Sequence, residues 1–396
     1  MRHPRRGRPR RTEPDTISAT ARPILNPTVI IRLTLGWGTF LALTLAKPLL
    51  APPVPAPLLI TALAFIIGII LVCAFGVVRE AEHLAHRLGD PYGSLVLTIS
   101  IVMIEVILIS AVMLGPGHHT TIARDSVMAV SMIILNAIIG LSLLTGGLKH
   151  NALRHNRTGT FTYLTLTTLL SFLAFALPAF IGDHGSYLPW QEGPIIVLIL
   201  FLYPFFLFQQ TNKRATDFKE IDPQAPTEHD TTQTKNPGIR QVITQHRTEI
   251  LLRTALLVVT VFPIVLLSHN MAALLDDGLE RAGAPVALAG VLIAMIVFLP
   301  ESITSVRAAL QGEIQRVSNL CHGGLVSTLG VTIPAVLLIG LLTDQPVVLA
   351  ESPTNPLLLV VTLILSITTF TAKKVTAVHG ATHLVLFAAY SLTIFS

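Results

Sequence analysis

Two glutamates embedded in apolar sequence are the residues of this chain best suited to chemistry. Glu105 lies in LVLTISIVMIEVILISAVML, and Glu301 lies in VALAGVLIAMIVFLPESITSV. A carboxylate near the middle of a bilayer is energetically costly, and such groups usually face a bundle interior, where they mark an ion or proton path. Two of them at matching places in the two halves of one chain are what the exchange of a cation for protons requires.

The chemistry that this pair supports is competition between a cation and protons. A hard divalent cation such as Ca²⁺ prefers about six to eight oxygen ligands, and two carboxylates supply up to four of them and cancel its charge. Burial and mutual repulsion favour the protonated form of an empty pair. The same two groups would therefore bind either one Ca²⁺ or two protons, and alternating access would convert this competition into exchange.

The remaining oxygens are expected from groups near the pair. The candidate ligands are Asn136, Thr328, Ser131, Ser302, Thr304 and the backbone carbonyl of Ile296. Thr304 follows Glu301 by three residues and shares its helix face. Pro300 lacks an amide hydrogen and so frees the carbonyl four residues earlier, although a plain kink explains this proline equally well. For the first two candidates, hydrogen bonding between helices alone is the alternative.

A second group of residues is a candidate for cation entry or pH sensing. Glu80, Glu82 and His83 lie in REAEHLAHRLGD, which we expect to form a short amphipathic helix on the inner side. A solvated helix at the membrane interface is the simpler account of this segment. His322 is expected at the inward end of a span, either as a proton relay inside the membrane or as a loop histidine.

The composition is that of an integral membrane protein. A soluble chain carries about a quarter charged residues, whereas here 12% are charged, 52% are hydrophobic and the mean hydropathy is +0.68. Cys73 and Cys321 both lie in or beside apolar sequence, which predicts buried thiols and not a disulfide framework or a metal cluster. We expect lipid and inorganic cations as the partners, and no cofactor, nucleic acid or obligate protein partner.

Apolar stretches of about 20 residues predict an all-α membrane protein with about 11 transmembrane helices. The expected spans are 28–50, 55–78, 92–114, 126–148, 160–182, 193–209, 249–268, 285–307, 317–343, 355–371 and 377–395. The predicted organisation is a basic disordered cytoplasmic tail (1–27), an extra N-terminal helix (28–50), a first five-helix repeat (51–209), a cytoplasmic linker (210–248) and a second, inverted five-helix repeat (249–396). An odd number of helices per repeat inverts the second copy, and such repeats place the substrate site at their interface.

The sequence around the two glutamates supports this repeat. GDPYGSLVLTISIVMIEV and GAPVALAGVLIAMIVFLPES each open on Gly-x-Pro, at Gly89 and at Gly283, and reach the glutamate at the same depth. The spans that follow align Asn136 with Thr328. The linker is expected to be flexible. A calcium-sensing role for its acidic residues is the alternative, with a spacing that does not match an EF-hand; these residues are Asp217, Glu220, Asp222, Glu228 and Asp230.

The distribution of positive charge predicts the orientation. With the N-terminus inside, the outward segments hold only Lys47, Arg124 and Arg281 of the 27 Lys and Arg residues. We therefore expect a cytoplasmic N-terminus and an external C-terminus. The basic tail has no apolar segment close behind it and no small-residue cleavage site, so we expect no cleaved signal, twin-arginine signals included.

Two longer stretches resemble a known family. REAEHLAHRLGDPYGSLVLTISIVMIEVILIS and LPESITSVRAALQGEIQRVSNLCHGGLVSTLGVTIPAV resemble the two α-repeats of the calcium/proton exchanger (CAX) branch of the cation/calcium antiporter superfamily, and most nearly its ChaA-type bacterial members. The likeness extends to the C-terminal HGATHLVLFAAYSLTIF. It implies eleven helices, export of Ca²⁺ against H⁺ across a bacterial inner membrane, and repeat glutamates at Glu105 and Glu301.

The chain departs from that family in one respect that bears on the cation. The Gly-Asn-x-x-Glu pattern of the wider family is absent, and Met103-Ile104-Glu105 and Leu299-Pro300-Glu301 stand in its place. ChaA-type proteins are associated with Na⁺ and K⁺ as well as Ca²⁺. A monovalent Na⁺(K⁺)/H⁺ antiporter using the same site is therefore the alternative to a Ca²⁺/H⁺ antiporter.

A membrane-embedded enzyme is disfavoured by the motifs. His379 and His383 have a spacing that suits zinc, but no His-Glu-x-x-His supplies a general base. The acidic group at Asp276, Asp277 and Glu280 has no second cluster with which to bind a diphosphate. A transporter accounts for both buried glutamates, and neither enzyme does.

Overall fold

The computed structural model describes residues 26–46, 54–88, 92–114, 120–211, 214–218, 244–285 and 287–395. Several parts of the sequence predictions lie outside these ranges. They are the tail up to residue 25, Lys47, the first Gly-x-Pro (Gly89 and Pro91), and most of the linker, including Glu220, Asp222, Glu228 and Asp230.

Eleven long helical rods make up the described part of the chain, and it contains no β-strand. The rods are α2 (Pro27–Leu45), α3 (Ala56–Leu88), α4 (Tyr92–Met113), α5–η2–α6 (Ile122–Met132, Ile133–Ile138, Ile139–His150), α7–η3–α8 (Arg157–Ser171, Phe172–Ala176, Leu177–Ile181), α9 (Pro189–Thr211), α11 (Arg247–Ala282), α12 (Ala287–Gln311), α13–η5–α14 (Ile314–Ser327, Thr328–Thr332, Ile333–Thr343), α15 (Thr354–Thr371) and α16 (Ala377–Thr393). Nine of the described rods are long and apolar enough to cross a membrane, and the other two are α4 and α16. The prediction of an all-α membrane protein is confirmed.

Two helices run well beyond the predicted spans. The span predicted at 55–78 is the first part of α3, which continues to Leu88, and the span predicted at 249–268 is part of α11, which continues to Ala282. The prediction that the segment around Glu80 forms a separate interfacial helix is wrong. It forms the last turns of α3, and its buried face packs on α11, where Arg253 pairs with Glu80.

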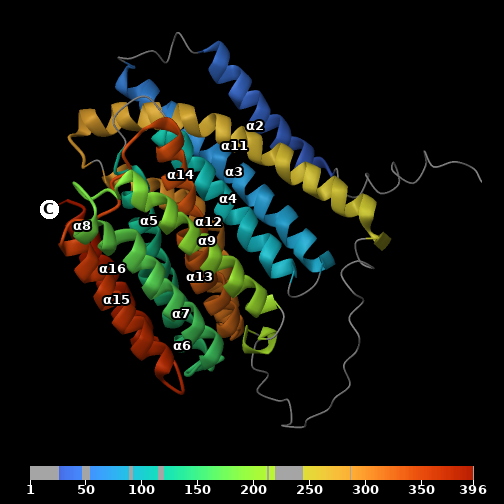
Figure 1. The fold of residues 1–396 in the computed structure, drawn as a ribbon. Coiled ribbons are helices and arrows are strands. Elements are labelled where there is room, and N and C mark those ends of the chain that lie inside the picture. Colours follow the sequence, from blue (N-terminus) through green and yellow to red (C-terminus); the bar gives the residue numbers. More distant parts are fainter. Residues whose placement is uncertain are drawn as a thin grey trace, which may run out of the picture.

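The helices of the two halves pack in corresponding ways. In the first half α4 packs against α13, η5 and α14, and in the second half α12 packs against α5, η2 and α6. In the same manner α9 packs on α14, and α16 packs on α6. The long helices α3 and α11 pack on each other, and α2 lies against both of them at one edge of the bundle, opposite the edge formed by α15 and α16 (Figure 1). This arrangement is what an inverted pair of repeats predicts.

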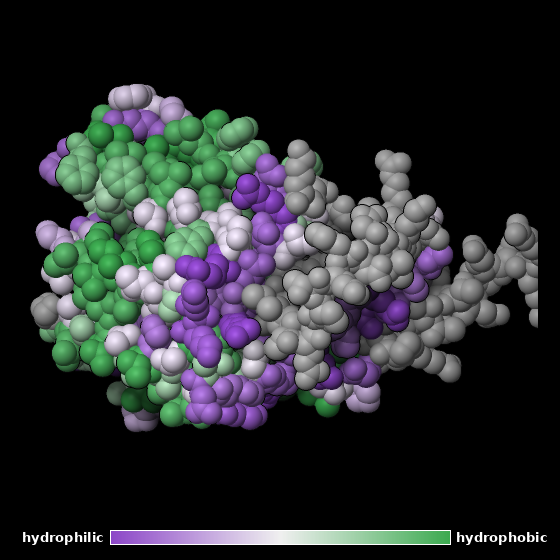
Figure 2. All heavy atoms as spheres, turned by 90° about the horizontal axis from the view of Figure 1, so that it is seen from below, coloured by the Kyte–Doolittle hydropathy of each residue, from purple (hydrophilic) through white to green (hydrophobic). Residues whose placement is uncertain are grey.

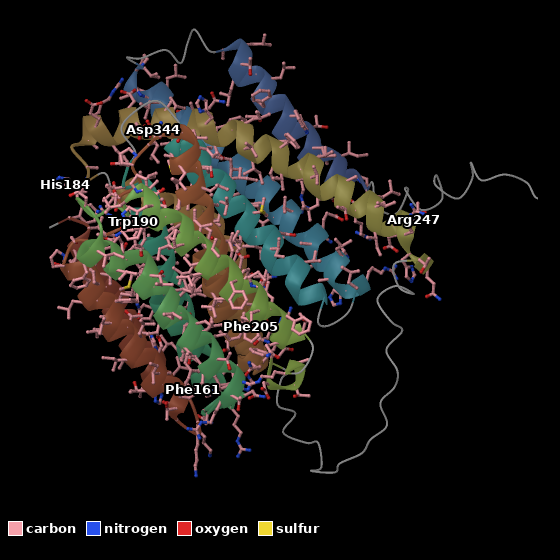
Figure 3. All side chains as sticks on the ribbon, in the orientation of Figure 1. Phe161, His184, Trp190, Phe205, Arg247 and Asp344 are labelled. Atoms are coloured by element: carbon pink, nitrogen blue, oxygen red, sulfur yellow. The ribbon has the colours of Figure 1, made fainter. Side chains whose placement is uncertain are left out.

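The connecting loops meet at two ends of the bundle. At one end Leu153 and Val375 exchange backbone hydrogen bonds of 2.9 and 3.0 Å, which joins the loop after α6 to the loop after α15. At the other end the backbone nitrogen of Leu349 donates to the carbonyl of Gly185 at 3.0 Å, which joins the loops after α14 and α8. His184 and Asp344 lie toward this second end, away from Phe161 (Figure 3). Alternate loops thus lie at alternate ends, as membrane crossings require.

The two ends differ in charge. The first end carries basic residues in and beside its loops: Lys149, Arg154, Arg157, Lys373 and Lys374. The loops 182–188 and 344–353 of the second end contain no Lys or Arg. Hydrophilic residues gather on the face seen from below, beside broad hydrophobic areas (Figure 2). Such a surface fits helices whose flanks contact lipid.

Candidate functional site

Glu105 joins the two repeats at the centre of the bundle. Its side chain comes from α4, and the residue is 1% exposed. The Thr328 hydroxyl of η5 donates a hydrogen bond to its Oε2 at 2.6 Å. The other carboxylate oxygen, Oε1, has no hydrogen-bond partner among the described residues. This hydrogen bond links the first repeat to the second, while the role of Thr328 as a cation ligand stays a prediction.

Glu301 has fewer hydrogen bonds in the described part of the chain than Glu105 has. It lies on α12, is 7% exposed, and neither of its oxygens has a hydrogen-bond partner within the described ranges. Ser302 and Thr304 donate back to their own helix, to the carbonyls of Phe298 and Pro300 at 2.7 and 3.0 Å. Each hydroxyl donates through its hydrogen and keeps the lone pairs of its oxygen, so the role of these two residues as ligands stays a prediction.

Three unpaired carboxylate oxygens are thus enclosed in one region. The two glutamates are close enough for their charges to interact. A buried charge without a partner is costly, so such a pair must be neutralised by protons or by a cation. Thr332, one turn after Thr328, is fully buried, and its hydroxyl is without a partner in the described part of the chain.

Both central rods contain a π-helical segment at this depth. The segment η2 contains Asn136 and η5 begins at Thr328, and these are the two residues that the repeat alignment pairs. Such segments are rare and occur frequently at functional sites. The sequence carries no signal for them, because the change from α- to π-helix depends on how each rod packs against its neighbours.

Asn136 forms hydrogen bonds to the last two helices. Its Nδ2 donates to Thr362 Oγ1 on α15 at 2.9 Å, and its Oδ1 lies 3.2 Å from His383 Nδ1 on α16. Ser131 donates to the carbonyl of Val127 at 2.8 Å. In the described part of the chain, no hydrogen bond joins Asn136 or Ser131 to either glutamate. These contacts favour the alternative of interhelical hydrogen bonding for Asn136.

Two further predictions from the sequence are the Ile296 carbonyl as a cation ligand and His379 with His383 as a pair of zinc ligands. Ile296 is buried on α12, and its role as a ligand stays a prediction. His379 forms the capping box of α16 with Thr376, while His383 is buried and bonded to Asn136, so the two histidines do not face one site. Within the described residues, no three His, Cys, Asp or Glu side chains are grouped as a metal site requires.

The residues predicted for cation entry differ in their exposure and in their ion pairs. Glu80 is buried and accepts from Arg253 Nη1 at 2.8 Å, and Arg253 also bonds Glu249 at 3.1 Å. Glu82 is partly exposed, and its carboxylate interacts electrostatically with that of Glu301. His83 is exposed. Of this group, Glu82 is the residue placed to influence a cation near the site.

His322 lies inside the bundle and not in a loop. It is fully buried, its Nδ1 lies 3.1 Å from Ser318 Oγ, and its ring meets Phe370 edge-on at 4.9 Å. Its Nε2 has no partner among the described residues. The loop alternative for His322 is therefore wrong, and a role as a proton relay stays a prediction.

An ion-pair cluster lies at the second end of the bundle. Arg124 contacts Asp125 at 2.8 Å and Glu351 at 3.7 Å, and donates to the carbonyl of Ala350 at 2.9 Å. Burial raises the pKa of Glu351, although Asn355 and Arg124 oppose this effect. From the sequence Arg124 was expected only as one of the few outward basic residues.

Comparisons with known proteins agree with this architecture. Residues 58–211 and 252–396 match the family described as "Sodium/calcium exchanger protein". The chain is 32% identical over 330 residues to the sodium-potassium/proton antiporter ChaA of Escherichia coli (strain K12), which covers 83% of this chain and 87% of that protein.

Two solved structures have the same fold. The structure of native YfkE superposes with a TM-score of 0.69 at 17% identity, over 93% of this chain and 99% of that one. The H⁺/Ca²⁺ exchanger CAX superposes with a TM-score of 0.64 at 13% identity, over 92% and 89% of the two chains. At these identities the likeness extends to the fold alone.

Proposed function

Because the chain belongs to the sodium/calcium exchanger protein family, we propose that this membrane transporter of inorganic cations is a Ca²⁺/H⁺ antiporter. It would export Ca²⁺ in exchange for protons by alternating access. The observation that carries this proposal is the buried pair Glu105 and Glu301, with three carboxylate oxygens unpaired in the described part of the chain and Thr328 joining the repeats at Glu105.

The chemistry follows from the need to neutralise this pair. In one state Ca²⁺ takes the free oxygens of both carboxylates, with hydroxyl and carbonyl oxygens completing its shell. In the other state each carboxylate holds a proton. The empty, doubly charged pair is the unfavourable state in a low-dielectric interior, so each change of access carries either the cation or the protons.

The packing of the repeats supports alternating access. Thr328 of the second repeat bonds Glu105 of the first, so a movement of one repeat against the other changes the surroundings of both carboxylates. The Arg124 cluster lies at the second end, which we assign to the outside, and its ion pairs would help to hold that end closed. On this assignment the site would open toward the cytoplasm, where Glu82 would draw cations to Glu301.

A monovalent Na⁺(K⁺)/H⁺ antiporter is the second candidate. It is favoured by the similarity to a protein named as a sodium-potassium/proton antiporter. Two carboxylates that each accept a proton suit Ca²⁺ by charge, whereas one Na⁺ or K⁺ would leave a negative charge in the site. The paired carboxylates therefore favour the divalent cation.

We further propose a bacterial plasma membrane location with the N-terminus inside and the C-terminus outside. The concentration of Lys and Arg at the end formed by loops 151–156 and 372–376 supports this orientation. The boundaries of the two repeats, 51–209 and 249–396, belong to the same proposal. A cleavable tag after the last helix would be cut only from the outside, and cutting from the cytoplasmic side would contradict the orientation.

The function is tested in everted membrane vesicles that hold an inside-acid pH gradient. Ca²⁺, Na⁺ and K⁺ are added separately to vesicles with the wild type, Glu301→Gln, or Glu313→Gln as a matched change of an exposed, surface-paired glutamate. We expect Ca²⁺ to dissipate the gradient with the wild type and Glu313→Gln but not with Glu301→Gln. A response only to Na⁺ or K⁺ would support the second candidate, and no response to any cation would refute both.

A further inference from the structure

A carboxylate at the second end of the bundle is buried with only one of its oxygens paired. Glu351 lies in the loop after α14, its side chain is 2% exposed, and its Oε2 accepts a hydrogen bond from Asn355 Nδ2 at 2.9 Å. Its Oε1 is buried and has no hydrogen-bond partner among the described residues. The next residue, Ser352, is exposed, so this carboxylate lies close to the medium at that end. A buried oxygen without a donor favours the protonated form of a carboxylate.

Asp125, the neighbouring carboxylate, has partners for both of its oxygens. Its Oδ1 accepts from Arg124 Nε at 2.8 Å, and its Oδ2 accepts from Thr121 Oγ1 at 3.0 Å. Arg124 also lies 3.7 Å from Glu351, so one positive charge serves two carboxylates. When both carboxylates are ionised, one negative charge of this group is not balanced. Glu351 is the carboxylate that accepts a proton more readily, because it is the one with an unpaired oxygen.

This ion-pair cluster connects the two repeats. Arg124 belongs to α5 of the first repeat, and Glu351 belongs to the loop that follows α14 of the second. The helix α5 packs in turn on α12, where a Cβ on Gly290 would lie 2.8 Å from the carbonyl carbon of Asp125. Since α12 also carries Glu301, a change in the contact between Arg124 and Glu351 acts on a helix of the central site.

We propose that Glu351 takes up a proton from the outer medium during exchange, and that this proton loosens the ion pair with Arg124 so that the outer ends of the two repeats can separate. The inference rests on the proposed function, because it adds a proton-binding residue to the same exchange cycle, away from the central pair. The step is a proton transfer alone: hydronium gives up a proton, a bond forms between that proton and a Glu351 oxygen, and no group is oxidised or reduced. Arg124 affects Glu351 more strongly than Asp125 does, so protonation removes a net attraction between the repeats.

The other titratable groups around Glu351 agree with this assignment. Burial raises the pKa of Glu351, although two of its neighbours oppose this effect. Tyr390 of α16 faces the carboxylates of this end and is neutral near pH 7. In the loop 182–188, Asp183 and His184 are exposed and lie 3.7 Å from each other. None of these described groups supplies the missing donor to Oε1 of Glu351.

The test is the exchange of radiolabelled Ca²⁺ for unlabelled Ca²⁺ in everted membrane vesicles, whose lumen corresponds to the outer medium. Equal and saturating Ca²⁺ on both faces removes net proton transport, so the luminal pH acts only through groups that titrate on that side. The wild type, Glu351→Gln and Glu313→Gln are compared at luminal pH values of about 8 and about 6. With the wild type and Glu313→Gln, we expect the rate to rise by about threefold or more on acidification. With Glu351→Gln the rate should be high at both pH values, because an amide does not ionise.

Asn355→Leu is a second, graded test that keeps the carboxylate. Asn355 donates to the charged form of Glu351, so loss of this donor should move the rise in rate to a higher luminal pH by about one unit. The inference alone is overturned by a wild-type rate that ignores the luminal pH, by a wild-type profile in Glu351→Gln, or by a profile in Asn355→Leu that does not move to higher pH. No Ca²⁺ exchange in the wild type at either pH would overturn the proposed function and this inference with it.

Discussion

The two glutamates of the site are unequal. Glu105 already accepts a hydrogen bond from Thr328, whereas both oxygens of Glu301 are unpaired in the described part of the chain. A carboxylate held by a donor is oriented before a cation arrives, which lowers the cost of binding. On the proposed mechanism, Glu105 would be the fixed half of the site and Glu301 the half that a cation or a proton completes.

Replacing Thr328 with Val removes the donor at nearly constant volume. A hydrogen bond to a charged group contributes about 1.5–3 kcal/mol, so we expect the apparent affinity for the transported cation to fall by about tenfold or more. Thr328→Ser keeps the hydroxyl and should retain most of the affinity. The concentration dependence of vesicle transport measures both variants, and equal affinities for Val and Ser would show that the hydroxyl is not used.

His155, in the loop between α6 and α7, makes folding stability depend on pH. It is 4% exposed, its Nε2 faces the Phe370 carbonyl at 2.9 Å, and its Nδ1 has no partner among the described residues. Burial lowers the pKa of His155, an effect that the bond to Phe370 opposes and the charge of Arg157 reinforces. The folded state then binds fewer protons than the unfolded state, so this stability is present above about pH 6.5 and is lost as the pH falls from there through the lowered pKa of the folded state.

His155→Gln should remove part of that dependence. Thermal unfolding in detergent at about pH 7.5 and about pH 5.5 measures the effect. We expect the midpoint of the variant to fall less than that of the wild type on acidification. His86→Gln changes an exposed histidine of α3 and should behave like the wild type. An unchanged difference between the two pH values in His155→Gln would contradict this account.

Single residues of the site were predictable to different degrees. A carboxylate in an apolar run is visible in sequence, and the repeat alignment indicated Thr328 opposite the first half. The same alignment pairs Asn136 with Thr328, yet Asn136 bonds Thr362 and His383 instead of a glutamate. Those partners come more than 220 residues later in the chain, and no local pattern encodes where a side chain turns once distant helices pack.

At the scale of elements, the pair of long helices α3 and α11 is held together by a buried ion pair. The side chains of Arg253 and Glu80 are 14% and 7% exposed and lie 2.8 Å apart. Removing one partner of such a pair leaves an uncompensated charge and costs about 3–5 kcal/mol. The pair also explains why α3 continues through a charged segment that resembles a separate helix in sequence.

Arg253→Gln should therefore lower the free energy of unfolding strongly, and Glu80→Gln in the same chain should restore most of it. Chemical denaturation in detergent compares the single and double variants. A gain in the free energy of unfolding from the single to the double variant identifies the cause, because it is expected only if the unpaired Glu80 carboxylate destabilises the Arg253→Gln variant. A double variant as unstable as Arg253→Gln would mean that the arginine stabilises the helices in another way.

The contact between α6 and α16 depends on glycine. A Cβ on Gly380 would overlap the backbone nitrogen of Leu144 and lie 2.5 Å from the carbonyl oxygen of Gly140. Close approach of this kind is typical of packed membrane helices. Neither backbone can move away without separating the rods, so the cost reaches or exceeds the ~1–3 kcal/mol of ordinary overpacking.

Gly380→Ala should thus reduce the thermal midpoint or the yield of folded protein. Gly38→Ala on α2 is the matched control, because a Cβ there meets nothing within 4 Å. In that helix alanine is favoured over glycine by about 0.5–1 kcal/mol, so this control should be neutral or stabilising. Equal thermal midpoints and yields of the two variants would show that α6 and α16 can shift to accept the added methyl group.

At the scale of the whole molecule, the inverted repeat accounts for both the fold and the place of the site. Hydropathy and the match between the two glutamate segments were enough to predict the helices and their pairing. The ends of α3 and α11, the π-helical segments and the Arg124 cluster were not predictable, since each arises from contacts between segments far apart in the chain. The sequence thus indicated the two buried carboxylates and the pairing of the repeats, but not how the helices bend and extend around them.

The central claim is that the same two carboxylates bind either the cation or protons. It is tested most directly by the protons released when Ca²⁺ binds to purified protein, measured by titration calorimetry in buffers of different ionisation enthalpy. We expect the wild type to release about two protons for each Ca²⁺, and Glu105→Gln and Glu301→Gln each to bind more weakly and to release about one proton fewer. Ca²⁺ binding without proton release, or unchanged release in both variants, would contradict the account.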